Sequence, residues 1–175
     1  DYQLDVLQGG GTDSGELSKV GKGVVNMTLS IPSRYMHSSH TIVCEDDIVL
    51  GRDFFLLCEE LLPRYAQEER IMQIAAQNHS RRKDISNTYV YSFREDCWGW
   101  ASWARAWNRM DMAMSSVPTL SVISLIKKLG VVEGVMLMRT LRKAYKNLDT
   151  FSSWAYRWYL SILVNEGVVI KPGVN

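Results

Sequence analysis

The spacing of apolar residues in the first half of the chain predicts two strands joined by a helix. Residues 41–44 form an apolar run without alternation, which is typical of a strand that is buried on both faces. Residues 54–65 show a helical pattern with Asp53 as the expected N-cap, and residues 71–76 predict the next strand. This order is that of a βαβ unit, in which ligands bind at the carboxyl end of the first strand.

The second half of the chain is expected to be mainly helical. A strand is predicted where residues 89–93 alternate, and the polar residues 1–23 predict a loop. The remaining patterns predict a helix over residues 98–110, two helices over residues 120–129 and 132–145 that meet near Gly130, a last helix over residues 154–164 and a short strand over residues 168–170.

These elements predict an α/β fold of one domain, with a mainly parallel central sheet flanked by helices. With 175 residues, the chain is long enough to bury a core of its own. Three regions of residues 1–175 differ in pattern. Residues 1–40 have no clear pattern, residues 41–110 contain the first strands and most tryptophans, and residues 111–175 are mainly helical.

Composition and charge exclude some classes of protein. The net charge of +1 does not indicate the excess of basic residues that is typical of nucleic-acid-binding proteins. No segment has the pattern of a signal peptide or a transmembrane span. Three cysteines without regular spacing indicate a reducing, cytoplasmic compartment rather than a disulfide framework. The first residue is Asp1 and not methionine, as is expected of a segment of a longer protein.

Most of the charged residues in the two helices predicted between residues 120 and 145 are basic. Such amphipathic helices are compatible with peripheral association at the inner face of a membrane. The simpler alternative is a helix pair that packs on the domain and exposes its charged face to solvent.

Three consecutive acids, Glu45, Asp46 and Asp47, follow the first predicted strand. Neighbouring carboxylates repel one another unless a cation neutralises them, and Mn²⁺ or Mg²⁺ prefers oxygen ligands of this kind. A metal ion at this position would offset the charge on a diphosphate leaving group. The alternative is an acidic turn that is exposed to solvent.

Tryptophan is the residue type that stands out in the composition. Four of the six tryptophans, Trp98, Trp100, Trp103 and Trp107, lie within ten positions, which is typical of a core or of a site for a ring-shaped ligand. Trp103 and Trp107 are four residues apart and are predicted to share a buried helical face. One of Trp98 and Trp100 is expected to line a cleft, because residues two apart point in different directions in a strand or a helix.

Three segments resemble one family and occur in the expected order. They are IVCEDDIVLGRDFFLLCEELLPRY, YSFREDCWGWASWARAWNRMD and SSWAYRWYLSILVNEGVVIKPGVN, and they fall within residues 41–175. The chain resembles the GT-A-fold glycosyltransferases of the N-acetylglucosaminyltransferase I type and of bacterial surface-glycan synthesis. The resemblance implies a Rossmann-like fold and transfer of a hexosyl or N-acetylhexosaminyl group from a nucleotide-diphosphate-sugar donor to a glycan or lipid-linked acceptor.

The resemblance also implies roles for individual residues. Asp47 would bind the metal ion, while Glu45 and Asp46 would face the ribose and the sugar of the nucleotide-sugar donor. Five residues would line the sugar or acceptor pocket: Trp98, Gly99, Trp100, Trp154 and Arg157.

The chain departs from this family at two places. Residues 1–40 show no equivalent of the unit that holds the nucleotide base, and Ala155 stands where some relatives have a catalytic acid. Asp96 and Asp149 are the expected substitutes for that acid. The departures favour an alternative function, a non-catalytic carbohydrate-binding or interaction domain. A glycoside hydrolase ranks last, because adjacent acids on one turn do not flank a glycosidic bond.

Overall fold

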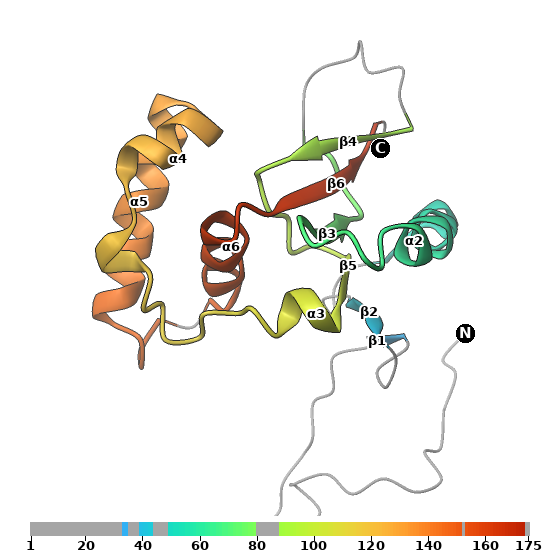
Figure 1. Cartoon of the computed structure of the whole chain (residues 1–175), viewed down its shortest axis with the longest axis horizontal. Coiled ribbons are helices and arrows are strands. Elements are labelled where there is room, and N and C mark those ends of the chain that lie inside the picture. Colours follow the sequence, from blue (N-terminus) through green and yellow to red (C-terminus); the bar gives the residue numbers. More distant parts are fainter. Residues whose placement is uncertain (1–32, 35–38, 44–48, 80–87, 152, 174–175) are drawn as a thin grey trace, which may run out of the picture. The chain divides into compact units, whose positions relative to one another are not determined.

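The structure of the chain is a computed structural model (Figure 1), and it describes residues 33–34, 39–43, 49–79, 88–151 and 153–173. Internal contacts distinguish two units, Asp1–Ile31 and Pro32–Asn175. The first unit lies outside the described residues, and so do the predictions for residues 1–23 and for the acids at positions 45–47. All the helices and strands described belong to the second unit.

The described residues contain one six-stranded sheet, with its strands in the order β1-β2-β5-β3-β6-β4. The bounds are β1 Ser33–Arg34, β2 His40–Val43, β3 Ile71–Ala75, β4 Tyr89–Ser92, β5 Trp100–Trp103 and β6 Val168–Pro172. Within this sheet β3 and β6 pair in parallel, and the other four pairs are antiparallel. The fold is therefore α/β with a mixed sheet flanked by helices, and the prediction of a mainly parallel sheet is wrong.

Strand β5 is the reason for this difference. The tryptophan spacing predicts a helix over residues 98–110, but β5 is a strand whose four side chains are all buried. It lies between β2 and β3, where Ala101 is paired with Ile42 on one side and with Ile74 on the other. Because β5 is antiparallel to both neighbours, β2 and β3 run in the same direction. The predicted βαβ connection is thus present, with helix α2, Arg52–Arg64, between its strands and β5 inserted in the sheet.

Helix α2 packs on the sheet with its apolar side, as its pattern predicts. Its buried side chains are Phe54, Cys58, Leu61 and Leu62. The predicted N-cap is wrong, because Gly51 occupies the cap position without a side-chain hydrogen bond. Asp53 lies in the first turn instead, where a negative charge interacts favourably with the helix dipole.

Further helical segments in the described residues come after β5. They are α3 Ala104–Trp107, a 3₁₀ turn η1 Val117–Thr119, α4 Val122–Leu129, α5 Val131–Lys146 and α6 Ala155–Val164. The predicted helix pair and the predicted last helix are confirmed. No helix in this part of the chain is both long enough and apolar enough to cross a membrane.

Helices α4 and α5 meet at Gly130 and approach each other closely. Gly130 has a φ of 89°, a left-handed conformation that glycine adopts without strain. A Cβ atom on Gly134 of α5 would lie 2.7 Å from the backbone nitrogen of Ile126 in α4, so a larger residue would push the helices apart.

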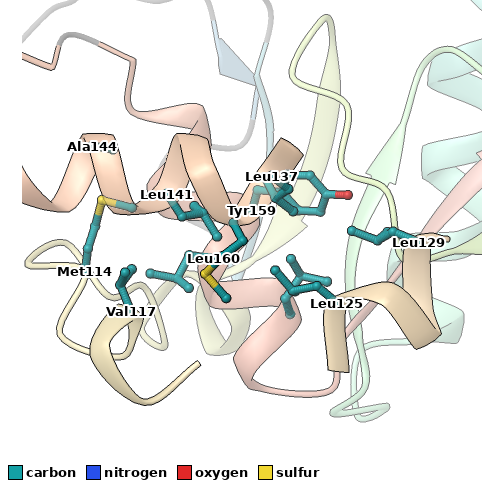
Figure 2. Close-up of a cluster of buried hydrophobic side chains, with 11 residues drawn as sticks. Met114, Val117, Leu125, Leu129, Leu137, Leu141, Ala144, Tyr159 and Leu160 are labelled. Carbon is teal, nitrogen blue, oxygen red and sulfur yellow. The ribbon is translucent and has the colours of Figure 1, made fainter. Parts of the chain in front are cut away.

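The helices enclose an apolar cluster that Figure 2 shows in close-up, and we call it the helical cluster. Its buried members are Met114, Val117, Leu125, Leu129, Leu137, Met138, Leu141, Ala144, Tyr159, Leu160 and Leu163. They come from α4, α5, α6 and the segment before α4, so one core holds these helices together.

Candidate functional site

The loop that joins β4 to β5, residues 93–99, contains two acids, Glu95 and Asp96, and we call it the acidic loop. In the sheet, β4 and β5 are separated by β6 and β3, so the loop passes across these two strands. Both strands contact it, since Gln73 on β3 and Lys171 on β6 each approach Asp96. The loop runs from beside Val169, near the amino end of β6, to beside Ala75 at the carboxyl end of β3, and it therefore brings polar side chains onto the sheet over both strands.

Gln73 holds the backbone of the acidic loop in place. Its side chain is fully buried, and its Nε2 donates a hydrogen bond to the carbonyl oxygen of Asp96. Its Oε1 accepts a 3.1 Å hydrogen bond from the indole Nε1 of Trp158 on α6. A buried amide that is bonded at both ends is directional, so it sets the position of the loop relative to β3 and α6.

Asp96 lies near three polar groups, but only its Oδ1 accepts a hydrogen bond, and its buried Oδ2 has no hydrogen-bond partner among the described residues. It is buried, its Oδ1 accepts a 3.3 Å hydrogen bond from the N–H of Trp98, and its Oδ2 lies 3.1 Å from the Nε2 of His79. The ammonium group of Lys171 is 3.8 Å from the same Oδ2. Burial lowers the pKa of Lys171, while the charges of Asp96 and Glu95 oppose this effect.

Glu95 has an unusual environment for a carboxyl group. Burial, followed by the charge of Asp96, raises its pKa to about 8, and Lys171 acts in the opposite direction. Its Oε1 is buried and has no hydrogen-bond partner among the described residues. At neutral pH this group is therefore mostly protonated, so the two neighbouring acids do not both carry a charge.

The open side of the site is formed by His79 and Trp98. The imidazole of His79 is 56% exposed, and its ring contacts the indole of Trp98 edge to face, with the centroids 5.5 Å apart. Trp98 is itself 51% exposed. An imidazole that lies against a buried carboxylate and is open to solvent can act as a general base, and the indole offers an apolar wall beside it.

Most of the other tryptophans form an aromatic cluster of their own. Trp100, Trp107, Trp154 and Trp158 have ring centroids 5.3–6.4 Å apart in the pairs that touch. Trp100 is buried in this cluster, whereas Trp107 is 45% exposed, so the prediction that Trp107 belongs to the core is wrong. Its helix, α3, is only four residues long and does not cover it.

Trp103 is a core residue, as predicted. It is 2% exposed, and its Nε1 donates a 2.9 Å hydrogen bond to the carbonyl oxygen of Leu62 at the end of α2. The guanidinium group of Arg105 stacks on its ring at 4.6 Å. Trp103 therefore fastens β5 to α2 and takes no part in the site.

Three other predicted site residues lie in structural positions. Gly99 has a φ of 79°, and a Cβ atom there would clash with the side chain of Leu50, so both the backbone and the packing favour glycine at this position. Arg157 donates a 2.9 Å hydrogen bond to the carbonyl oxygen of Leu148, and Asp149 is exposed in the same turn after α5. The structure thus brings Asp96 and Trp98 together and places Arg157 and Asp149 at the connection between α5 and α6.

His79, Glu95 and Lys171 are functional candidates that the sequence analysis did not single out. Two local signals were present: His79 follows a predicted strand at the end where ligands bind in α/β sheets, and Glu95 stands next to Asp96. Lys171 has no such signal, because a lysine in a short terminal strand is usually exposed.

The structure does not describe the predicted metal site. Asp47, with Glu45 and Asp46, lies outside the described residues. Within the described ranges, no group of three or more His, Cys, Asp and Glu side chains is placed to hold a metal ion.

Comparison with known families relates the N-terminal segment to a peptidase. The family model of M42 glutamyl aminopeptidase matches residues 1–52, which are 52 of the 175 residues of the chain. No solved structure matches the chain.

This match corrects the glycosyltransferase interpretation, because the family that it names is one of peptidases. The nucleotide-sugar donor, the glycan or lipid-linked acceptor and the carbohydrate-binding alternative are corrected with it. The physical reason is that acids after an apolar strand attract a divalent cation whatever reaction the cation serves, so this motif alone does not specify sugar transfer.

Proposed function

We propose that the chain is part of a peptide hydrolase in which His79 is the acid–base residue and Asp96 positions its imidazole. The observation that supports the substrate class is the similarity of residues 1–52 to the M42 glutamyl aminopeptidase family. The contact between His79 and the acidic loop supports the position of the site, since it places an exposed imidazole against a buried carboxylate beyond the carboxyl end of β3.

Hydrolysis of an amide requires a base for water and an acid for the leaving amine. His79 takes a proton from the attacking water, whose oxygen forms the new bond to the carbonyl carbon. The carbon–nitrogen bond then breaks, and His79 returns the proton to the amine. Asp96 positions the imidazole, since its Oδ2 lies 3.1 Å from the Nε2 of His79.

The neighbours of Asp96 adapt the site to this role. Because the carboxyl group of Glu95 keeps its proton up to about pH 8, it adds no second negative charge beside Asp96 at neutral pH. Lys171 supplies a buried positive charge 3.8 Å from Asp96. Trp98 gives the site an apolar wall for a side chain of the substrate.

A divalent cation is compatible with this function, since M42 peptidases depend on such cations. Asp47 remains the predicted ligand, and the choice between Mn²⁺ and Mg²⁺ remains a prediction from the preference of carboxylates for hard cations. The roles of His79 and Asp96 given above need only the described residues. The cytoplasmic location likewise remains a prediction from the cysteine pattern.

The proposal is tested by assaying the whole chain against a panel of aminoacyl p-nitroanilides, with added Mn²⁺ and with a chelator. We expect hydrolysis that Asp96→Asn lowers at least about 100-fold in kcat/KM, because a misoriented base loses most of its effect. Asp53→Asn, which changes an exposed acid in the first turn of α2, is the matched control and should keep the activity.

Two results would overturn the proposal. One is the absence of hydrolysis by the folded chain under every metal condition, above all if the chain binds a nucleotide-sugar with Mn²⁺ instead. The other is equal activity of Asp96→Asn and Asp53→Asn, which would place the site elsewhere.

A further inference from the structure

A groove of about 650 Å³ opens between the N-terminal half of α5, α6 and the start of the acidic loop. This volume is in the range of pockets that bind small molecules. Its walls include Leu129, Val132 and Met136, together with the rings of Tyr156 and Tyr159. Val132 and Met136 are 74% and 62% exposed, so the groove presents apolar surface that a ligand could cover.

Charges of opposite sign lie side by side in this groove. Arg94 and Glu133 both line it, and their side chains form an ion pair. They are 59% and 31% exposed, so solvent and ligands reach both groups. A guanidinium group suits a carboxylate and a glutamate suits an ammonium group, so the pair is complementary to a zwitterion.

Tyr159 adds a buried polar group that interacts with Glu133. The residue is 9% exposed, and its hydroxyl group makes no hydrogen bond of ordinary geometry with the described residues. In Figure 2 the ring lies in the helical cluster, and the hydroxyl group points away from Met114 and Ala144. Burial, followed by the charge of Glu133, raises the pKa of this phenol, so it stays a neutral donor. A buried phenol without a hydrogen bond of ordinary geometry can also donate to an oxygen atom of a ligand.

We propose that this groove binds a small zwitterion with an apolar side chain, either a free amino acid or a dipeptide. Arg94 binds the carboxylate of the ligand and Glu133 binds its ammonium group. The apolar side chain packs on Val132, Met136 and the ring of Tyr156. The inference rests on the groove alone, so it stands or falls separately from peptide hydrolysis.

Calorimetric titration of the whole chain with three compounds that cannot be hydrolysed tests the proposal. They are phenylalanine, phenethylamine, which lacks the carboxylate, and 3-phenylpropanoate, which lacks the ammonium group. We expect phenylalanine to bind at least about tenfold more tightly than either, since each charged contact is worth a factor of this order. A fourth titration, with leucyl-phenylalanine, distinguishes a dipeptide from a free amino acid as the better ligand.

Variants then assign each charge to its partner. Arg94→Gln should abolish the advantage of phenylalanine over phenethylamine, and Glu133→Gln should abolish its advantage over 3-phenylpropanoate. The matched control is the exposed ion pair of Arg109 and Glu69, which does not line the groove. Arg109→Gln and Glu69→Gln should leave all the affinities unchanged.

The proposal is overturned if phenylalanine, phenethylamine and 3-phenylpropanoate bind equally well, or if neither they nor the dipeptide bind at millimolar concentration. It is also overturned if Arg94→Gln and Glu133→Gln behave like the control pair. Circular dichroism melting curves of all four variants verify that each is folded when it is titrated.

Discussion

The helical cluster and the contact between the acidic loop and the sheet are both buried, but different forces hold them. Leu141 and Leu160, each fully buried, represent a cluster that is stabilised by apolar contact alone. Gln73 is equally buried, yet it lies between two hydrogen bonds, one to the backbone of Asp96 and one to the indole of Trp158.

The difference shows that, within one small domain, one set of contacts stabilises the fold and another sets the position of the site residues. Apolar contacts have no direction, so a cluster of leucines tolerates small shifts and holds helices together without placing any single atom. A buried amide fixes both its partners in direction and distance. The acidic loop, which positions Asp96 and His79, is held by contacts of the second kind.

The largest effect is expected for Leu141→Ala in the helical cluster. Because Leu141 is fully buried, the substitution should lower the free energy of unfolding by about 4 kcal/mol. Urea denaturation followed by circular dichroism measures it, with Leu56→Ala on the exposed side of α2 as the control. Below the transition, the contact of His79 with Trp98 should remain unchanged in NMR spectra. If it is lost, the two regions are not independent.

A somewhat smaller effect is expected for Gln73→Leu. The variant leaves the carbonyl oxygen of Asp96 and the Nε1 of Trp158 buried and unpaired, which should cost about 3 kcal/mol. Unlike Leu141→Ala, it should also change the indole and imidazole signals of Trp98 and His79 in the folded state. The exposed Gln67→Leu serves as the control. Unchanged signals in Gln73→Leu would show that the amide does not position the loop.

Glu95→Gln should alter how stability depends on pH. The pKa of Glu95 is raised to about 8 from its ordinary 4.5, so the folded state holds this proton more tightly than the unfolded state does. The resulting stability is fully present below about pH 4.5 and is lost as the pH rises to about 8.

The neutral glutamine lacks this dependence. Between pH 6 and pH 9 the wild-type protein should therefore lose about 3 kcal/mol more free energy of unfolding than Glu95→Gln does. Urea denaturation at the two pH values measures this difference, and the contributions of groups that do not interact with Glu95 cancel in it. Parallel losses in the two proteins would show that Glu95 is ionised in the folded state.

The smallest effect on stability is expected for Trp98→Ala. Since the indole is half exposed, its removal should cost less than about 1 kcal/mol, whereas Trp100→Ala, in the buried aromatic cluster, should cost about 3 kcal/mol or more. Thermal melting of the two variants compares them directly. Hydrolysis of substrates with large apolar side chains should fall in Trp98→Ala. A large loss of stability in that variant would instead make Trp98 a core residue.

Part of the fold could be predicted because apolar spacing reports which side chains are buried. The helix pair that meets at Gly130, the strand β3 and the helix α6 all lie close to their predicted positions. Strand β5 could not be predicted in the same way. Its tryptophans are compatible with a buried strand and with a buried helix, and pairing with β2 and β3 decides between them.

The sequence by itself identified Asp96 and Trp98 as candidates for a site, since an acid stands directly before a segment that is unusually rich in tryptophan. Only the tertiary structure decided which groups join them. His79 follows β3 and Lys171 lies on β6. Both side chains reach Asp96 because the acidic loop, which joins β4 to β5, passes across β6 and β3. Local patterns encode the burial of a residue, whereas contacts between distant polar side chains depend on strand order and on the paths of loops.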